Sequence, residues 1–404
     1  MPETETETKN LLILTVGTGT AGKYSNLAEG LRRTVELLHP RRFWLVPSLS
    51  EDSQIMADLV SEGFKNFAAL SPEARYRAIA DPDNLEVCRE TLRAAIAAAR
   101  KELRPSERLL INPTSGTKQM TAAATLAALD ENIGDIVFTV GERADGVVKT
   151  GTERIMPFDA SAYFRERDFK TASELFASGG FYAAARILEP HKTVLLHAQA
   201  TALMCHHWQR FDYEKAAGHA SRFDEQLRRA FAARARAVKE GKPDAGVLAD
   251  ILSWAKFAFD RQDYDESVRL SYKAIEYAAK CRLAEKFNLF PEASGFYEPE
   301  KVYALHCDFE AQFEAFARPK LVLGQQNLMI ILETLGDEPG TSWLGNRKST
   351  ACARTRNENT HSIRPIGEAE AQAILARVSS AVNAIFTLPS LFIPGRLPAE
   401  AIHQ

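Results

Sequence analysis

The sequence lacks paired cysteines and long apolar runs. Its five cysteines lie far apart and form no CxxC pair, a pattern that argues against a disulfide framework or a structural zinc site and favours reduced thiols in a cytoplasm. No run approaches the roughly 18 apolar residues of a membrane span, so no membrane association is expected. Residues 1–9 are polar and acidic, and we expect a disordered lead-in there, not a signal peptide.

The chain also lacks a strong charge of either sign. Its formal net charge is −3 over 404 residues, so the overall charge gives no argument for nucleic-acid binding, although a local basic groove remains compatible with it. The composition, 45% hydrophobic and 25% charged, is that of a globular protein. This length exceeds what one hydrophobic core supports, and two or three domains are expected.

Strand and helix patterns alternate in the N-terminal third. Apolar runs typical of strands occur at residues 11–16, 42–47, 109–112, 135–140 and 147–157, the last two joined by a turn at 143–146. Helical patterns lie at residues 25–38, 54–64, 84–103 and 121–129. The alternation predicts a doubly wound α/β domain with a parallel sheet over residues 10–157.

Two polar loops follow strands in this domain and open helices. They read GTGTAGK at residues 17–23 and PTSGTK at residues 113–118. Loops in this position lie at the carboxyl edge of a parallel sheet, where such folds bind ligands. Backbone amides, hydroxyls and a lysine at a helix start favour an anion, phosphate above all.

Other interpretations of the first loop remain open. Gly17 to Lys23 matches GxxxxGK, but Tyr24 stands where a P-loop needs a magnesium-binding Ser or Thr. The same glycines match a dinucleotide fingerprint, yet the acid about 20 residues on, Glu36, lies in a helix and not at a strand end. In the third interpretation, Gly17 and Gly116 merely allow tight strand-to-helix turns.

Helical patterns fill the rest of the chain, with a connector region expected at residues 158–262 and a further domain at 263–404. They occur at residues 170–177, 182–188, 194–208, 213–238, 247–261, 263–287, 309–316, 321–335 and 367–388. Residues 336–350 form a polar, glycine-rich stretch that predicts a loop. Cys205, His206 and His207 are consecutive, and because neighbouring helical positions point about 100° apart, a packed or surface helix segment is expected there and not a metal site.

A hexapeptide near the C-terminus carries the clearest catalytic groups. Arg356 and His361 stand at its two ends, with Asn357 beside the arginine. Arginine offers a planar cationic fork for a phosphate, and histidine exchanges protons near neutral pH. Five positions on a regular helix separate two side chains by about 140°. A single helix therefore does not aim both groups at one phosphate, whereas a twofold dimer brings two copies of the segment together.

These motifs resemble a known family. LLILTVGTGT, followed by LLINPTSGTKQMTAA, is similar to the CARF domain, and R-N-x(3)-H in a helical C-terminal region resembles the motif of HEPN ribonucleases. Together they resemble the CRISPR-associated CARF–HEPN ribonucleases of type III systems. The resemblance implies a Rossmann-like sensor domain at residues 10–157, a helical HEPN domain at 263–404, and a homodimer.

The resemblance also assigns roles. It implies that a cyclic oligoadenylate activates cleavage of single-stranded RNA without a metal or other cofactor, and that the products carry a 2′,3′-cyclic phosphate. The residues matched to ligand binding are Gly17, Thr18, Gly19, Thr20, Thr114, Ser115, Gly116, Thr117 and Lys118. Those matched to catalysis are Arg356, Asn357 and His361. Arg269, Tyr272 and Glu276 resemble positions that line the catalytic groove, although a charged helix face of this kind is ordinarily solvated.

The sequence leaves three functions open. The first is a switched endoribonuclease in antiviral defence, whose sensor domain could also degrade its own ligand slowly. The second is a sensor without catalysis, whose helical domain binds RNA or a protein partner. The ring size of the activator and the RNA sequence preference do not follow from the sequence. A nucleotide-dependent ATPase or oxidoreductase built on residues 17–23 is a third possibility.

Overall fold

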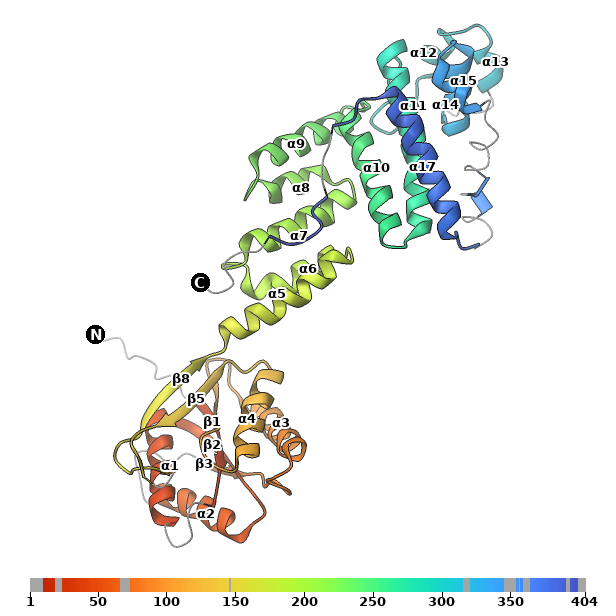
Figure 1. Cartoon of the computed structure of the whole chain (residues 1–404). Coiled ribbons are helices and arrows are strands. Elements are labelled where there is room, and N and C mark those ends of the chain that lie inside the picture. The colour runs from red at the N-terminus through yellow and green to blue at the C-terminus, as the bar shows by residue number, and fades with distance from the viewer. Residues whose placement is uncertain are drawn as a thin grey trace, which may run out of the picture. The chain divides into compact units, whose positions relative to one another are not determined.

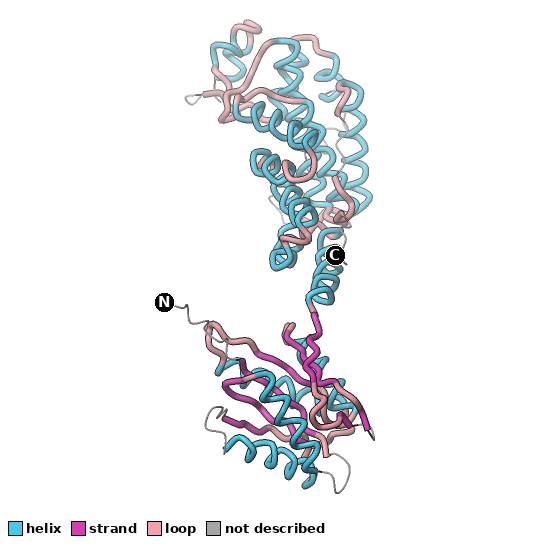
Figure 2. The backbone as a smooth tube through the Cα atoms, turned by 90° about the vertical axis from the view of Figure 1, so that its left-hand side faces the viewer, coloured by secondary structure: helices cyan, strands magenta, loops and turns pink. Residues whose placement is uncertain are grey.

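The computed structural model describes residues 10–18, 24–65, 73–144, 147–314, 320–344, 354–355, 357–358, 364–389 and 393–398. The chain divides into two compact units, Met1–Arg167 and Asp168–Gln404 (Figure 1). Strands lie in the first unit and helices make up nearly all of the second, as Figure 2 shows. None of the helices in the described ranges combines the length and apolar character that a membrane crossing needs.

The first unit is built on a six-stranded sheet with the order β3-β2-β1-β4-β5-β8. Its strands are β1 (Asn10–Val16), β2 (Pro40–Pro47), β3 (Glu73–Tyr76), β4 (Leu109–Asn112), β5 (Asp135–Val140) and β8 (Arg154–Asp159). The first five run parallel, and β8 pairs antiparallel with β5, with Asp135 opposite Asp159. The predicted fold class, an α/β domain followed by helices, is confirmed.

Helices cover both faces of this sheet. Alternate residues of β1 serve two cores: Leu11 and Ile13 pack with α3 (Leu85–Glu102) and α4 (Lys118–Asp130), and Leu12 and Leu14 pack with α1 (Tyr24–Leu38) and α2 (Glu51–Lys65). A strand buried on both faces needs apolar side chains at every position, which explains the continuous run in β1. Because β1 and β4 are parallel neighbours in the sheet, their carboxyl ends lie side by side at the same edge.

The second unit is a helical array that begins within α5 (Ser161–Ala177). Along the chain it continues with α6 (Phe181–Leu188), η1 (Glu189–His191), α7 (Leu196–Gln209), α8 (Tyr213–Ala220), α9 (Glu225–Lys239), α10 (Ala245–Asp260), α11 (Tyr264–Phe287), α12 (Pro299–Tyr303), α13 (Phe309–Phe313), α14 (Gln325–Thr334), α15 (Glu338–Leu344) and α17 (Glu368–Ile385). One core runs through it, with Trp208, Trp254 and Phe309 among its fully buried side chains. Helix α11 packs against α10, α14 and α17.

Several predicted elements differ from the structure. The helix predicted over residues 213–238 is two helices, because the chain turns after Ala220 and Asp224 caps α9 by accepting a hydrogen bond from the Leu227 amide. The stretch predicted as a loop at residues 336–350 contains α15. The strand predicted over residues 147–157 is divided: β7 (Val147–Val148) pairs with β6 (Arg143–Ala144) in a short hairpin, and β8 follows separately.

Candidate functional site

The two loops at the sheet edge touch each other. The Gly17 amide donates to Ser115 Oγ at 3.0 Å, and a Cβ on Gly17 would lie 2.8 Å from the Gly116 Cα. Gly116 itself has φ +116°, a conformation that favours glycine. Both positions therefore require glycine: Gly17 for the close approach, and Gly116 for its backbone. Gly19 and Thr20, also predicted to bind ligand, lie outside the described residues.

The second loop leads directly into α4, whose first residue is Lys118. The Thr117 hydroxyl caps this helix by accepting from the Met120 amide at 3.2 Å, and it donates to the Pro82 carbonyl at 2.6 Å. Lys118 and Gly116 are exposed, whereas Ser115 is buried. The helix start offers unpaired backbone N–H groups and a positive dipole end beside an exposed ammonium. This arrangement suits a phosphate or the polar edge of a nucleotide.

A buried polar network, which no sequence motif marks, holds this loop in place. The Asn112 side chain donates to Thr139 Oγ1 at 2.9 Å and accepts from the Thr114 amide at 3.1 Å. Thr114 Oγ1 in turn accepts from the Thr139 amide at 2.8 Å, and the Thr139 and Thr34 hydroxyls are 2.9 Å apart. The Thr114 hydroxyl is thus committed to the frame of the loop. An asparagine that ends an apolar strand was the available signal.

Replacing Asn112 by alanine is therefore expected to destabilise the protein. Thr139 Oγ1 and the Thr114 amide each lose a buried partner, at a cost of about 1–3 kcal/mol in the free energy of unfolding. Urea denaturation of the full chain measures this change, with Thr121→Ala as the control because the Thr121 hydroxyl bonds at an exposed site. Equal unfolding midpoints for Asn112→Ala and the control contradict the structural role.

The C-terminal hexapeptide lies between α15 and α17. Arg356 and His361 fall outside the described residues, as do Asn359 and Thr360. Asn357 is exposed, and Asn357 and Glu358 have helical backbone, as do Arg354 and Thr355 just before them. Beyond the hexapeptide, the Ile366 amide donates to Asp265 Oδ1 at 3.2 Å in the first turn of α11. The chain after the hexapeptide is thereby tied to the start of α11.

The three groove candidates lie further along α11. Arg269, one turn after Asp265, pairs through its guanidinium with Glu266, with an Nε–Oε2 distance of 2.5 Å. Glu276 accepts from Lys280 Nζ at 2.8 Å, and Tyr272 between them is half-buried. Both ion pairs run along the helix, the first at an exposed position and the second partly buried. Helix α11 contacts the chain after the hexapeptide through the hydrogen bond from the Ile366 amide to Asp265 and through its packing against α17.

A histidine ladder occupies the helices before α9. The ring of His207 on α7 stacks on that of His219 on α8, with centroids 5.5 Å apart and planes at 6°, and His206 lies against Tyr182. Burial lowers the pKa of His206, His207 and His219. Cys205 is buried and His206 and His207 are half-buried on α7, as in a packed helix segment.

This ladder predicts a dependence of stability on pH. Because the folded-state pKa values are lowered, the unfolded chain takes up protons first, and the free energy of unfolding falls as the pH drops through the ordinary histidine range near about 6.5. We expect a lower thermal midpoint at pH ~5.5 than at pH ~7.5. His219→Gln should reduce that difference in calorimetry, and an unchanged difference in this variant contradicts the assignment.

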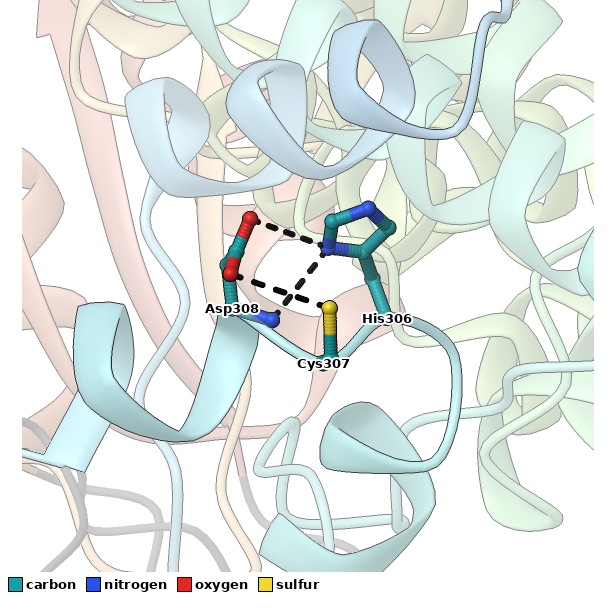
Figure 3. A group of neighbouring side chains, drawn as sticks. All are labelled: His306, Cys307 and Asp308. Atoms are coloured by element: carbon teal, nitrogen blue, oxygen red, sulfur yellow. Dashed lines mark hydrogen bonds and ion pairs between the residues drawn. The ribbon is translucent and has the colours of Figure 1, made fainter.

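One group in the described part of the chain could hold a metal ion by its geometry. His306, Cys307 and Asp308 are consecutive, and their ligand atoms lie within 4.8 Å of one another (Figure 3). The Asp308 amide donates to His306 Nδ1 at 3.3 Å, and Cys307 Sγ lies 3.7 Å from Asp308 Oδ1. These local hydrogen bonds at the start of α13 already account for the convergence of the three side chains.

The fold is that of a CARF–HEPN protein. The resemblance seen in the motifs is therefore confirmed at the level of the fold, and of the fold alone. One solved structure that shows it is "Enterococcus italicus Csm6 bound to cyclic hexa-2'-fluoro-hexa-dAMP", which matches with a TM-score of 0.60, over 94% of this chain and 95% of that chain. The two sequences are 11% identical. No protein-family model matches the chain, and no curated protein does.

Proposed function

We propose that this protein is an endoribonuclease of type III CRISPR antiviral defence, activated by a cyclic oligoadenylate and cleaving single-stranded RNA. The observation that carries the proposal is the fold likeness, along 94% of the chain, to a Csm6 protein whose structure holds cyclic hexa-2'-fluoro-hexa-dAMP. The hexapeptide with Arg356 and His361 supports the catalytic part, because those two groups suffice for attack on a phosphodiester.

The activator binds at the sheet edge of the first unit in this proposal. Gly17 to Thr20 and Thr114 to Lys118 line the site. The contact between Gly17 and Ser115, and the exposed Lys118 at the start of α4, support it. A cyclic oligoadenylate carries one phosphate per nucleotide, which the helix start and the ammonium match in charge. A slow cleavage of the ligand at this site is part of the proposal only as a secondary activity.

The nuclease site acts without a metal. A ribose 2′-hydroxyl attacks the adjacent phosphorus, the bond to the 5′-oxygen of the next nucleotide breaks, and a 2′,3′-cyclic phosphate forms. His361 moves the proton as general base or acid. Arg356 stabilises charge that develops on the phosphate oxygens, and Asn357 orients the backbone or the substrate. DNA lacks the 2′-hydroxyl nucleophile and should resist cleavage.

A homodimer completes this site. The described residues beside Arg356 are helical, and on a continuous helix Arg356 and His361 point about 140° apart. A twofold axis that pairs two hexapeptides supplies both groups to one phosphate. The proposed domain limits are residues 10–157 for the sensor, 158–262 for the connector and 263–404 for the nuclease, where Arg269, Tyr272 and Glu276 would line the groove. The scattered cysteines favour a cytoplasmic location.

Incubation of the full chain with end-labelled single-stranded RNA tests the proposal. We expect cleavage that requires cyclic tetra- or hexa-adenylate, persists in EDTA, and leaves 2′,3′-cyclic phosphate ends. Saturable binding of the cyclic oligoadenylate without any cleavage would instead identify a non-catalytic sensor. Tight ATP or NAD binding abolished by Lys23→Ala would favour the nucleotide-enzyme interpretation. EDTA-sensitive cleavage contradicts the metal-free mechanism.

A further inference from the structure

Two carboxylates bind the chain on both sides of the candidate catalytic hexapeptide. Glu370, in the first turn of α17, accepts from the Thr355 hydroxyl at 2.7 Å and from Arg364 Nη2 at 3.3 Å. Glu358 accepts from Arg354 Nε at 2.6 Å and from Arg364 Nη1 at 2.9 Å. We name this set of five side chains the carboxylate clasp.

The residues of the clasp flank the segment that carries the candidate catalytic groups. Thr355 comes directly before Arg356, and Arg364 comes three residues after His361. Glu370 therefore joins the two ends of the segment that carries both candidate catalytic groups. Closing a short segment at its ends removes much of its conformational freedom, and this is the kind of constraint that a catalytic geometry needs.

The base of the clasp is fixed to the helical core. Ile366, between Arg364 and Glu370, is buried at 7% exposure, and Ala371 is fully buried. The Ile366 amide also donates to Asp265 on α11. Glu370 thus projects from a turn that packing and a hydrogen bond hold in place. Such a turn can transmit a fixed position to Thr355 and Arg364, in contrast to a freely moving surface side chain.

The clasp also neutralises the negative charge of Glu358. Glu358 lies inside the hexapeptide, where an unpaired carboxylate would repel a polyanionic substrate. Hydrogen bonding to Arg354, and then to Arg364, lowers the pKa of Glu358, so this carboxylate is ionised at neutral pH and each of its oxygens faces a guanidinium. Arg364, bonded to both Glu358 and Glu370, is the shared element of the set.

We propose that Glu370 is a positioning residue for RNA cleavage: through Thr355 and Arg364 it holds together the two ends of the segment that carries Arg356 and His361. The inference rests on the proposed nuclease function and adds to it a residue that touches neither substrate nor reacting atoms. Exposed ion pairs contribute little to overall stability. The effect of Glu370 should therefore be seen in the turnover number and not in the unfolding midpoint.

The test is steady-state RNA cleavage by the activated full-length protein. Glu370→Gln keeps an acceptor for Thr355 but loses the charge that binds Arg364, and we expect kcat to fall about 10- to 100-fold with KM nearly unchanged. Glu370→Asp, which restores the charge on a shorter side chain, should recover part of the loss. Thr355→Val removes the opposite contact and should lower kcat in the same direction. Glu300→Gln, in the first turn of α12, is the matched control and should behave as wild type.

Hydrogen exchange of the peptide covering residues 354–364 supplies a readout besides activity. We expect faster exchange in Glu370→Gln than in the wild type and in Glu300→Gln. Wild-type turnover together with wild-type exchange in Glu370→Gln overturns the clasp while the nuclease function stands. If the wild-type protein cleaves no RNA with any cyclic oligoadenylate, the proposed function fails and the positioning role falls with it. A rise in KM alone also contradicts the proposal, because it indicates substrate binding.

Discussion

His361→Ala and Arg356→Ala are each expected to lower activated RNA cleavage by about 10³-fold. The histidine moves a proton in the transition state, and the arginine meets charge that develops there, so the loss should fall on kcat more than on KM. The two losses should not add in the double variant, since both groups act on the same step. Single-turnover cleavage of labelled RNA at saturating activator measures the effect.

Matched controls separate chemistry from folding. His306→Ala removes a histidine from the local cluster at the start of α13, and Arg229→Ala removes a well-exposed arginine on α9. Both should cleave RNA at the wild-type rate. Wild-type cleavage by both His361→Ala and Arg356→Ala contradicts the catalytic assignment. Cleavage lost equally in His306→Ala would point to unfolding or to a different site.

Gly17→Ala is expected to raise the activator concentration needed for half-maximal cleavage by at least about 10-fold. A Cβ at this position would lie 2.8 Å from both the Cα and the amide nitrogen of Gly116, so the two loops must move apart, and a shift of this size disrupts a preorganised site. Because the nuclease groups are unchanged, cleavage at saturating activator should approach that of the wild type. A titration of cleavage against activator concentration measures the half-maximal activator concentration and the maximal cleavage rate separately.

Gly134→Ala is the control for this prediction. A Cβ there meets only Phe164, at an ordinary contact distance of 3.6 Å. Lys118→Ala provides a second variant that leaves the contact between the loops intact but removes the exposed ammonium, and it should also weaken activation. A Gly17→Ala protein activated at the wild-type concentration would show that the loops are only structural turns, which was the third interpretation of their glycines.

The sequence predicts much of the first unit because its strands carry a strong signal. The runs at β1 and β4 are apolar at nearly every position, as burial on both faces requires. Gly17 and Ser115, which follow these two strands, meet at the sheet edge as predicted. No predicted strand covers β3, which is only four residues long. This short edge strand forms because it pairs with β2. Such pairing depends on the tertiary fold and not on the local sequence.

The site residues were predictable only in part. Chemical groups such as Lys118 and His361 are visible in a motif, but supporting residues are defined by contacts across the fold. Asn112 and Thr139 meet because β4 and β5 are neighbours, and Glu370 reaches Thr355 over 15 positions. The helix and strand periodicities of a sequence do not show contacts between residues far apart in the chain. The network around Asn112 and the carboxylate clasp are therefore visible only in the structure.

The most direct test of the central claim is a titration of RNA cleavage by cyclic oligoadenylates of different ring size, on the full-length protein. The claim predicts negligible cleavage without ligand, saturable activation by one ring size at lower concentration than by the others, and persistence of the activity in EDTA. Cleavage that is independent of every cyclic oligoadenylate, or its absence at all concentrations, would contradict the account of a ligand-switched ribonuclease.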